Sequence, residues 1–406
     1  MNILTLAHGH PRKHKGGGEV AAYAMHSLLQ ASGHHSVFVG WGGFESEHSQ
    51  PHLRLNDHEY ELYSSCNFFD FSSASNNALQ ALSHLLSTHQ PDVVHLHHYV
   101  HVGIEVAALV KRLLPRCKVL LTLHEYLAIC MNNGQLVTTD KLLCQGATLE
   151  RCVQCFPQHS EADFFRRRVF IQAALSYVDH FIAPSEFLRQ RYIDWGLEAQ
   201  RIHTIENPLP SVQHHTAWPQ TPPKNNQEWV LGFFGQINYY KGLDVILEGV
   251  SQALLRGATV RVNIHGKYSE VTGTDYIESL QAHINALGAA AHFAGPYQQG
   301  DVLGLMSACH FVVMGSRWYE NSPVVIREAI AAARPLLVPK LGGMEEKAQG
   351  SGLFFAANTP HALADVLCGM QAEHYQQLSA QAMHRAQQEK KEFEQSLSRI
   401  IHLYGA

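Results

Sequence analysis

Two glutamates, Glu320 and Glu328, stand eight positions apart in the stretch W-Y-E-N-S-P-V-V-I-R-E at residues 318–328. Between them, Ser322 and Pro323 are of the types preferred at the cap and the first position of a helix. We therefore expect a helix start, whose free amides and dipole favour an anion. Glu328 would lie on the second turn and accept hydrogen bonds from ribose hydroxyls. Glu320 precedes the helix and could reach the hydroxyls of a sugar.

Two further junctions are rich in glycine. Gly17 and Gly18 lie in H-K-G-G-G-E-V just before an expected helix, and glycines let a backbone approach a ligand closely. Gly235 ends a strand in G-Q-I-N-Y-Y-K-G, where Lys241 can act as a point charge on phosphate oxygens. Taken alone, the first stretch fits a flexible loop equally well, and a lysine placed like Lys241 is more often a solvated first-turn residue than a ligand. The three junctions together favour a nucleotide diphosphate that carries a sugar.

Four cysteines follow the T-L-H-E stretch with the spacing C-x13-C-x7-C-x2-C: Cys130, Cys144, Cys152 and Cys155. Four thiolates can coordinate a structural zinc ion tetrahedrally. A long loop without periodicity is usually either stabilised by a cross-link or functional. The spacing predicts a structural zinc ion in loop 130–155. Four ordinary thiols in a flexible acceptor loop, or iron–sulfur ligation, are the alternatives.

Elements that could position these residues alternate along the whole chain. Short apolar runs such as NILTLA, DVVHLHH, WVLGFFG and HFVVMGS are separated by amphipathic stretches. This alternation is typical of βαβ units and parallel sheets, which bind ligands at the carboxyl ends of their strands. The proline-rich stretch 207–228 breaks the pattern and predicts a linker. We expect one domain over 1–206, a second over 229–385, and a helix over 386–406 that packs back toward the first.

Composition excludes some classes of function. A net charge of −5 over 406 residues argues against nucleic-acid binding, which needs a basic surface. The chain has no apolar run of about 18 residues that could span a membrane. Its N-terminus, MNILTLAHGH, reads as a first strand and not as a signal peptide. We therefore expect a cytoplasmic protein.

Over nearly its whole length the chain resembles a GT-B glycosyltransferase of the large retaining family 4. The motifs that carry this resemblance are E-x7-E from Glu320 to Glu328, the G-G-G-E-V loop, P-D-V-V-H-L-H-H at 91–98, T-L-H-E at 122–125, and the G-x6-G segment with Lys241. The resemblance implies an α/β fold of two facing Rossmann-like domains, each with a doubly wound parallel sheet, and a C-terminal crossover helix.

The resemblance also implies roles for single residues. Glu328 would hold the ribose of a nucleotide-sugar donor, Glu320 the donor sugar, and Lys241 the diphosphate, while His124 would line the sugar site. No metal ion would be required for catalysis. Many members carry an arginine where this chain has Gln236, so the diphosphate would depend on Lys241, helix amides and Arg317. The reaction centre would be Glu320, His124 and Lys241, and the donor-binding set would be Gly17, Gly18, Gly235, Gln236, Lys241, Arg317, Asn321, Ser322, Pro323, Val324 and Glu328.

The expected activity is retaining transfer of a sugar from a nucleotide-diphosphate sugar to a glycan or lipid-linked acceptor, in the synthesis of bacterial surface polysaccharide. A GT-B nucleotide-sugar epimerase and a degenerate nucleotide-sugar-binding protein are the alternatives. The stretch D-F-F-R-R-R-V-F-I at 163–171 combines aromatic and basic residues, which can dock on anionic lipid head groups. Peripheral contact with the inner face of the membrane is one interpretation, and a buried apolar stripe with a solvated basic face is the other.

Overall fold

The computed structural model describes residues 1–13, 16–48, 50–207, 228–270 and 272–405, with the side chain of Lys390 left aside. The chain divides into two compact units. Unit 1 comprises Met1–Pro210 with Phe393–Ala406, and unit 2 comprises Ser211–Glu392. Apart from Asn207 and Glu228, the predicted linker 207–228 lies outside the described residues. Within the described parts of the chain, no helix is long and apolar enough to cross a membrane.

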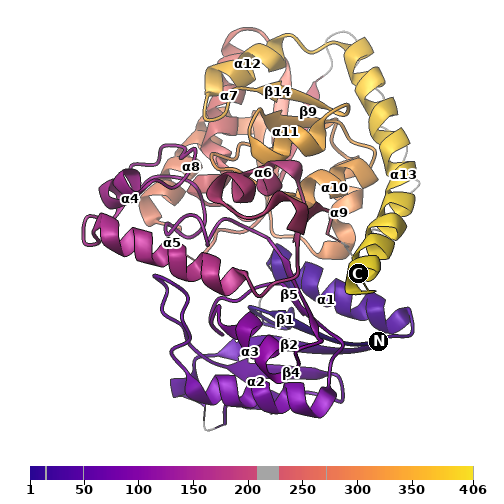
Figure 1. Ribbon diagram of the computed structural model, residues 1–406. Helices are drawn as coiled ribbons and strands as arrows, with labels where there is room; N and C mark the ends of the chain where they lie inside the picture. The colour runs from indigo at the N-terminus through magenta and orange to yellow at the C-terminus, as the bar shows by residue number, and fades with distance from the viewer. Residues whose placement is uncertain (14–15, 49, 208–227, 271, 406) are drawn as a thin grey trace. The chain divides into compact units, whose positions relative to one another are not determined.

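Unit 1 is built on a sheet whose described strands follow the order β3-β4-β2-β1-β5-β6-β7-β8. Figure 1 labels four of these neighbours, β4, β2, β1 and β5. All neighbouring pairs are parallel except β3 with β4. Leu4 pairs with Val37 on one side and Val94 on the other, and all three are buried. The strands are β1 Asn2–Ala7, β2 His35–Gly43, β3 His52–Arg54, β4 Glu59–Tyr63, β5 Val93–Leu96, β6 Lys118–Thr122, β7 His180–Ala183 and β8 Ile202–Thr204.

Several helices of unit 1 begin at side-chain caps. Ser75, Ser160 and Ser185 each accept a hydrogen bond from a backbone amide of the first turn, and Asp163 completes a capping box with Ser160. The helices are α1 Gly17–Ala31, α2 Asn76–His89, α3 Val106–Leu113, α4 Leu149–Cys155, α5 Glu161–Leu175 and α6 Glu186–Trp195.

Unit 2 has a parallel sheet with the described strands in the order β11-β10-β9-β12-β13-β14. These strands are β9 Trp229–Phe234, β10 Val260–His265, β11 Ala291–Gly295, β12 Phe311–Val313, β13 Leu336–Pro339 and β14 Gly352–Phe355. The accompanying helices are α7 Leu243–Leu255, α8 Thr274–Leu287, α9 Val302–Ser307, α10 Val324–Ala331, α11 Gly342–Ala348, α12 Pro360–Cys368 and α13 Ala372–Gly405.

Helix α13 belongs to both units. Arg385 in its first half donates to Ser351 Oγ of unit 2 at 2.7 Å. In its last turns, Ile400, Leu403 and Tyr404 are buried in the core of unit 1. The prediction of two parallel-sheet α/β domains with a C-terminal helix is confirmed.

One predicted boundary differs. We expected Ser322 at the cap of a helix and Pro323 at its first position. In the structure Pro323 itself stands at the cap, with an extended backbone at φ −63° and ψ 126°, and α10 begins at Val324. The ring of proline fixes φ but leaves ψ free, so it fits either position.

Candidate functional site

In unit 2, Glu320 and Lys241 are in contact although they lie 79 residues apart in the sequence. Glu320 follows β12 and is buried. Its Oε1 accepts hydrogen bonds from Lys241 Nζ at 2.6 Å, Ser316 Oγ at 2.9 Å and Trp318 Nε1 at 2.9 Å. Three donors on one oxygen hold the carboxylate in a fixed orientation. Its Oε2 has no donor among the described residues and is left to accept from a ligand.

A contact between two glycines places Lys241 beside Glu320. Lys241 ends the short 3-10 helix Tyr239–Lys241, and Gly242 follows with φ +61°. A Cβ added at Gly242 would lie 2.0 Å from the carbonyl oxygen of Gly315. Such an approach excludes any side chain at Gly242, and so the loop after β9 can lie directly against the loop after β12.

Glu328 lies on α10 and is buried. Its Oε1 accepts a hydrogen bond from Gln299 Nε2 at 2.5 Å, which joins α10 to the turn after β11. Burial raises the pKa of the Glu328 carboxyl, and the hydrogen bond from Gln299 opposes this shift. A buried carboxylate with a single neutral donor has remaining capacity to accept from ligand hydroxyls.

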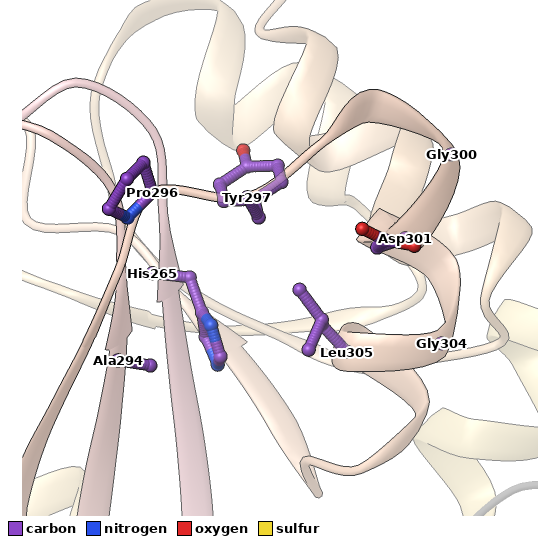
Figure 2. A pocket seen from close by; sticks show the side chains of 8 residues that line it. All are labelled: His265, Ala294, Pro296, Tyr297, Gly300, Asp301, Gly304 and Leu305. Atoms are coloured by element: carbon purple, nitrogen blue, oxygen red, sulfur yellow. The ribbon is translucent and has the colours of Figure 1, made fainter.

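A pocket of about 550 Å³ opens at the carboxyl ends of β10 and β11. Figure 2 shows the side chains of His265, Tyr297 and Leu305 around its open space. Burial, with the charge of Glu328 as the smaller cause, raises the pKa of Tyr297 to about 12, so the pocket lies within electrostatic reach of Glu328. Its lining consists of His265, Ala294, Pro296, Tyr297, Gly300, Asp301, Gly304 and Leu305.

None of the residues that line this pocket was predicted from the sequence. The segment P-Y-Q-Q-G-D at 296–301 follows a strand and contains a glycine and an aromatic residue, which was the available signal. The ring of His265 stacks on Phe234 with centroids 4.8 Å apart and an interplanar angle of 9°. The pocket therefore has one wall fixed by aromatic packing.

Arg317, predicted to help hold the diphosphate, makes several contacts with its own unit. Its guanidinium donates to both carboxylate oxygens of Asp244, at 3.0 and 2.5 Å, and its Nε donates to Asn358 Oδ1 at 2.6 Å. These contacts occupy most of its N–H groups and link Arg317 to the start of α7. Gln236 is exposed after β9.

The other predicted donor residues of unit 2 surround the start of α10. Pro323 is buried, and Asn321, Ser322 and Val324 are partly exposed. A Cβ added at Gly343 would lie 1.8 Å from the carbonyl oxygen of Asn321, so the loop before α10 rests on α11. Gly235, with φ +129°, has open space around it.

In unit 1, the predicted residues Gly18 and His124 lie close together. A Cβ added at Gly18 would be 3.2 Å from His8 Cε1 and 3.6 Å from the His124 ring. Gly17 is the first residue of α1, and Glu19 on the same turn lies 3.2 Å from His8 Nε2. The start of α1 and the end of β6 therefore meet at one edge of the sheet.

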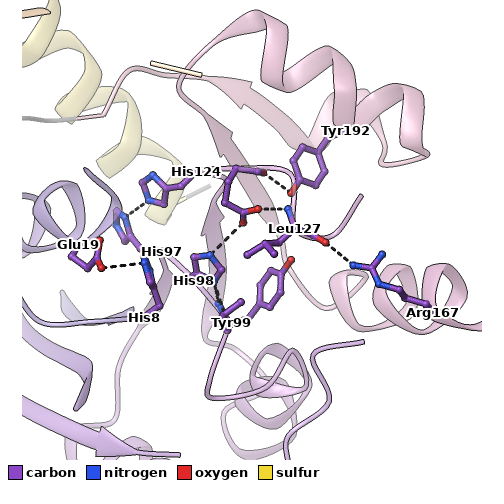
Figure 3. A network of polar contacts seen from close by, with 11 residues as sticks. His8, Glu19, His97, His98, Tyr99, His124, Leu127, Arg167 and Tyr192 are labelled. Carbon is purple, nitrogen blue, oxygen red and sulfur yellow. Dashed lines mark hydrogen bonds and ion pairs between the residues drawn. The ribbon is translucent and has the colours of Figure 1, made fainter. Parts of the chain in front are cut away.

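A chain of imidazoles supports His124 (Figure 3). His97 Nδ1 and His124 Nε2 share a hydrogen bond of 3.1 Å. The ring centroids of His95 and His97 lie 4.4 Å apart. The two ring nitrogens of His95 form hydrogen bonds with Thr122 Oγ1 at 2.7 Å and with Tyr404 Oη at 2.8 Å. Burial lowers the pKa of His95 and of His124 to about 3. These imidazoles are therefore neutral at pH 7.

Glu125, next to His124 in sequence, forms a second polar group. His98 Nδ1 accepts hydrogen bonds from the backbone amides of Tyr99 and Val100, both at 3.0 Å. In neutral His98 the proton must then be on Nε2, which lies 3.3 Å from Glu125 Oε1. Glu125 Oε2 accepts from the backbone amide of Leu127. Burial raises the pKa of Glu125 to about 8.

The structure gives no support to the predicted zinc site. Among the described residues, which include Cys130, Cys144, Cys152 and Cys155, no three His, Cys, Asp or Glu side chains are placed to hold a metal ion. Cys144 Sγ instead donates to the carbonyl oxygen of Gly146 at 3.3 Å. Burial raises the pKa of Cys130, and that of Cys152 to about 11, which favours neutral thiols over the thiolates that a metal needs.

Comparison with known proteins gives consistent results for both halves of the chain. Residues 15–211 match the model described as Glycosyltransferase Family 4, and residues 228–372 match the model described as Glycosyl transferases group 1. A D-inositol 3-phosphate glycosyltransferase of Corynebacterium jeikeium strain K411 is 30% identical over 144 residues. The aligned part spans 34% of this chain and 34% of that relative.

Solved structures match over the full length. Anabaena HepE in complex with UDP and glucose is 18% identical, with a TM-score of 0.68 and coverage of 100% of both chains. Sucrose-phosphate synthase from Thermosynechococcus elongatus is 15% identical, with a TM-score of 0.67 and coverage of 100% of this chain and 98% of that one. At these identities the matches establish the fold.

Proposed function

Because the chain belongs to the group 1 glycosyltransferases of family 4 and has the GT-B fold, we propose that it transfers a sugar from a nucleotide-diphosphate sugar, with retention, to a hydroxyl of a glycan or lipid-linked acceptor. The observation that carries the proposal is the arrangement in unit 2. There a fixed Lys241–Glu320 pair and a second buried carboxylate, Glu328, accompany a pocket at the carboxyl ends of the strands.

The pocket receives the nucleobase in this proposal. Its aromatic wall suits a flat ring, and Glu328 is close enough to Tyr297 to raise its pKa. Glu328 then takes the ribose hydroxyls, with Gln299 beside it. A uridine nucleotide is the first candidate, because the Anabaena HepE structures hold UDP.

The diphosphate and sugar lie between Lys241 and the start of α10 in this proposal. As the bond between the anomeric carbon and the diphosphate oxygen breaks, negative charge grows on the diphosphate. Fixed donors stabilise that charge best, because they need no reorganisation. Lys241 Nζ and the first amides of α10 are such donors, and Oε2 of Glu320 can accept from a sugar hydroxyl. The proposed reaction assigns no role to a metal ion.

Unit 1 holds the acceptor in this proposal, and surface polysaccharide synthesis is the process that it serves. Helix α5 has apolar side chains exposed to solvent, Phe165 at 57% and Val169 at 48%. Arg166, next to Phe165 in the sequence, is ion-paired with Asp163, and Arg168 on the same helix is exposed. Such a face suits peripheral contact with an anionic lipid surface on the inner side of the cell membrane.

A thermal-shift screen with UDP-, GDP-, ADP- and CDP-glucose tests the donor site. We expect one donor to raise the Tm of the wild-type protein. Lys241→Ala should shrink that shift strongly, because it removes the cation beside the diphosphate, whereas Lys267→Ala, at an exposed lysine of the same unit, should keep it. The proposal fails if no donor stabilises the wild-type protein or if Lys241→Ala responds as the wild-type protein does. Appearance of an epimer from the donor alone would instead identify a nucleotide-sugar epimerase.

A further inference from the structure

We infer that four aromatic side chains of unit 1 form a platform on which a sugar ring of the acceptor stacks, an assignment that rests on the proposed function. The platform consists of Trp41, Phe44, Phe68 and His101. Trp41 lies near the end of β2, Phe44 follows β2, Phe68 follows β4 and His101 follows β5. Because β4, β2, β1 and β5 are parallel neighbours, all four residues lie at the carboxyl edge of the sheet, where parallel sheets bind ligands.

The four rings of the platform pack against one another around His101. Its imidazole stacks on Trp41 with centroids 3.9 Å apart and an interplanar angle of 13°. Phe44 and Phe68 meet the same imidazole nearly at right angles, with centroids 6.0 and 5.6 Å away. The indole is oriented by a hydrogen bond from Trp41 Nε1 to the carbonyl oxygen of Ser64 at 3.0 Å. Contacts within the protein therefore fix how these rings are presented.

Two rings of the platform are open to a ligand. Phe44 is 40% exposed and Phe68 is 54% exposed. Phe68 stands on a closed turn, because a backbone bridge pairs Cys66 with Ser73, and the amide of His101 donates to Cys66 Sγ at 3.2 Å. Water contact with large apolar side chains is unfavourable, and contiguous exposed apolar groups with a polar rim mark binding surfaces. The platform is therefore accessible and held in place.

The polar groups next to Phe44 suit the hydroxyls of a sugar. The C–H groups on one face of a pyranose form an apolar surface that can pack on an aromatic ring, while its hydroxyls reach sideways to hydrogen-bonding groups. Glu45 follows Phe44 directly and accepts from Asn77 Nδ2 at 2.5 Å. Asn77 is exposed and Glu45 is partly exposed, and a carboxylate with one donor on one oxygen can accept further hydrogen bonds.

The charges near the platform separate a sugar from an anionic lipid surface. Glu45 and Glu47 belong to one short 3-10 helix after β2, and two carboxylates repel anionic head groups. Lys13 Nζ reaches the carbonyl oxygen of Gly42 at 3.2 Å, but Glu61 balances its charge at 2.8 Å. A neutral, hydroxylated ligand therefore fits this surface better than a lipid head group does.

Saturation-transfer NMR with cellobiose and with maltose, each added to the full chain without nucleotide, tests the platform. We expect at least one of these probes to bind the wild-type protein, with the strongest transfer to C–H protons on one face of a ring. Phe68→Ala should raise its Kd at least roughly fivefold, because an aromatic face is lost. Phe68→Leu should weaken binding as well, whereas Phe68→Tyr keeps the ring and should bind as the wild-type protein does. Since Phe68 is exposed, the Tm should change little in these variants.

Phe165→Ala is the matched control, at a phenylalanine of α5 in the same unit that is 57% exposed, and it should leave the Kd of the sugar unchanged. The platform is overturned if neither probe binds the wild-type protein, or if Phe68→Ala or Phe68→Leu binds as tightly as the wild-type protein. Binding to phosphatidylglycerol vesicles that falls in Phe68→Ala, without sugar binding, would identify a membrane surface instead. Since no nucleotide is present, these results are independent of the donor screen, and failure of the proposed function would appear there and not here.

Discussion

At the scale of single residues, three buried or partly buried carboxyl groups of this protein differ in the hydrogen-bond donors that hold them. Glu320 is held by a lysine and two neutral donors on one oxygen. Glu328 has one amide donor, and Glu125 has an imidazole and a backbone amide. Loss of a charged partner from a buried carboxylate is costly, because the remaining charge is left uncompensated. We therefore expect Glu320 to be the most sensitive of the three to changes in its neighbours.

Glu125 makes stability depend on pH. Burial raises its pKa to about 8, above the value of about 4.3 for a free glutamate. The folded state keeps a proton that the unfolded chain has released, so the contribution is fully present below about pH 4.3 and is lost as the pH rises through about 8. The groups that face it are His8, His98 and Arg167, with Tyr99 on the neighbouring strand end.

The measurement is urea unfolding of wild-type protein and Glu125→Gln between about pH 6 and pH 8. The wild-type protein should lose up to about 1.4 kcal/mol of unfolding free energy per pH unit more than the variant. Glu150→Gln, at an exposed glutamate of α4, should follow the wild-type slope. Parallel slopes for wild-type protein and Glu125→Gln would show that this carboxyl does not titrate in the window.

At the scale of elements, the site of unit 2 depends on loops that touch through their backbones. Gly242 and Gly315 are in contact from the ends of β9 and β12, two strands that pair in the sheet. The close approach sets where Lys241 stands relative to Glu320. A change in either glycine therefore acts on the ligand site through the position of a loop and not through a lost side chain.

Gly242→Ala tests this element. The new Cβ would lie 2.0 Å from the Gly315 oxygen, and φ is +61°. We expect a loss of at least about 2 kcal/mol of unfolding free energy, together with loss of the donor-induced Tm shift. Gly273→Ala, at the cap of α8 with open space around it, is the matched control and should change neither. A Gly242→Ala variant that keeps the wild-type donor shift would separate the loop contact from the ligand site.

Elements were predictable from the sequence where a repeating pattern defines them. Apolar runs such as WVLGFFG mark strands that are buried on both faces, and β9 occupies that segment. Side-chain partners were not predictable in the same way. Nothing local in the sequence shows that Arg317 holds Asp244, 73 residues away, or that burial raises the pKa of Cys130 and Cys152. The resemblance named Lys241 and Glu320, but only the folded loops show them 2.6 Å apart.

At the scale of the whole molecule, helix α13 joins the cores of both units. Ile400, Leu403 and Tyr404 are packed with Ile3 and Met25 in unit 1. The hydroxyl of Tyr404 also reaches His95, so the last turns contribute to the polar chain behind His124. The end of the sequence is therefore part of the framework that positions the residues of unit 1.

Ile400→Ala tests this framework. Ile400 is buried in the unit 1 core, and truncation of a buried isoleucine costs about 2–5 kcal/mol. We expect a drop of that size in urea unfolding, with the transition of unit 1 shifted to lower urea. Leu255→Ala, at a leucine that is almost fully exposed on α7, should leave the curve within about 0.5 kcal/mol. An unchanged transition in Ile400→Ala would show that the last turns do not stabilise unit 1.

The path of α13 also fixes an order of events during synthesis. Residues 400–404 complete a core whose other buried residues, from Ile3 to Ile205, are synthesised long before them. A ribosome releases this last helix only after all of unit 2 has emerged. Until then, the core of unit 1 lacks the side chains of residues 400–404. The first half of the chain expressed alone would lack these side chains, and we expect it to depend on chaperones that cover exposed apolar surface.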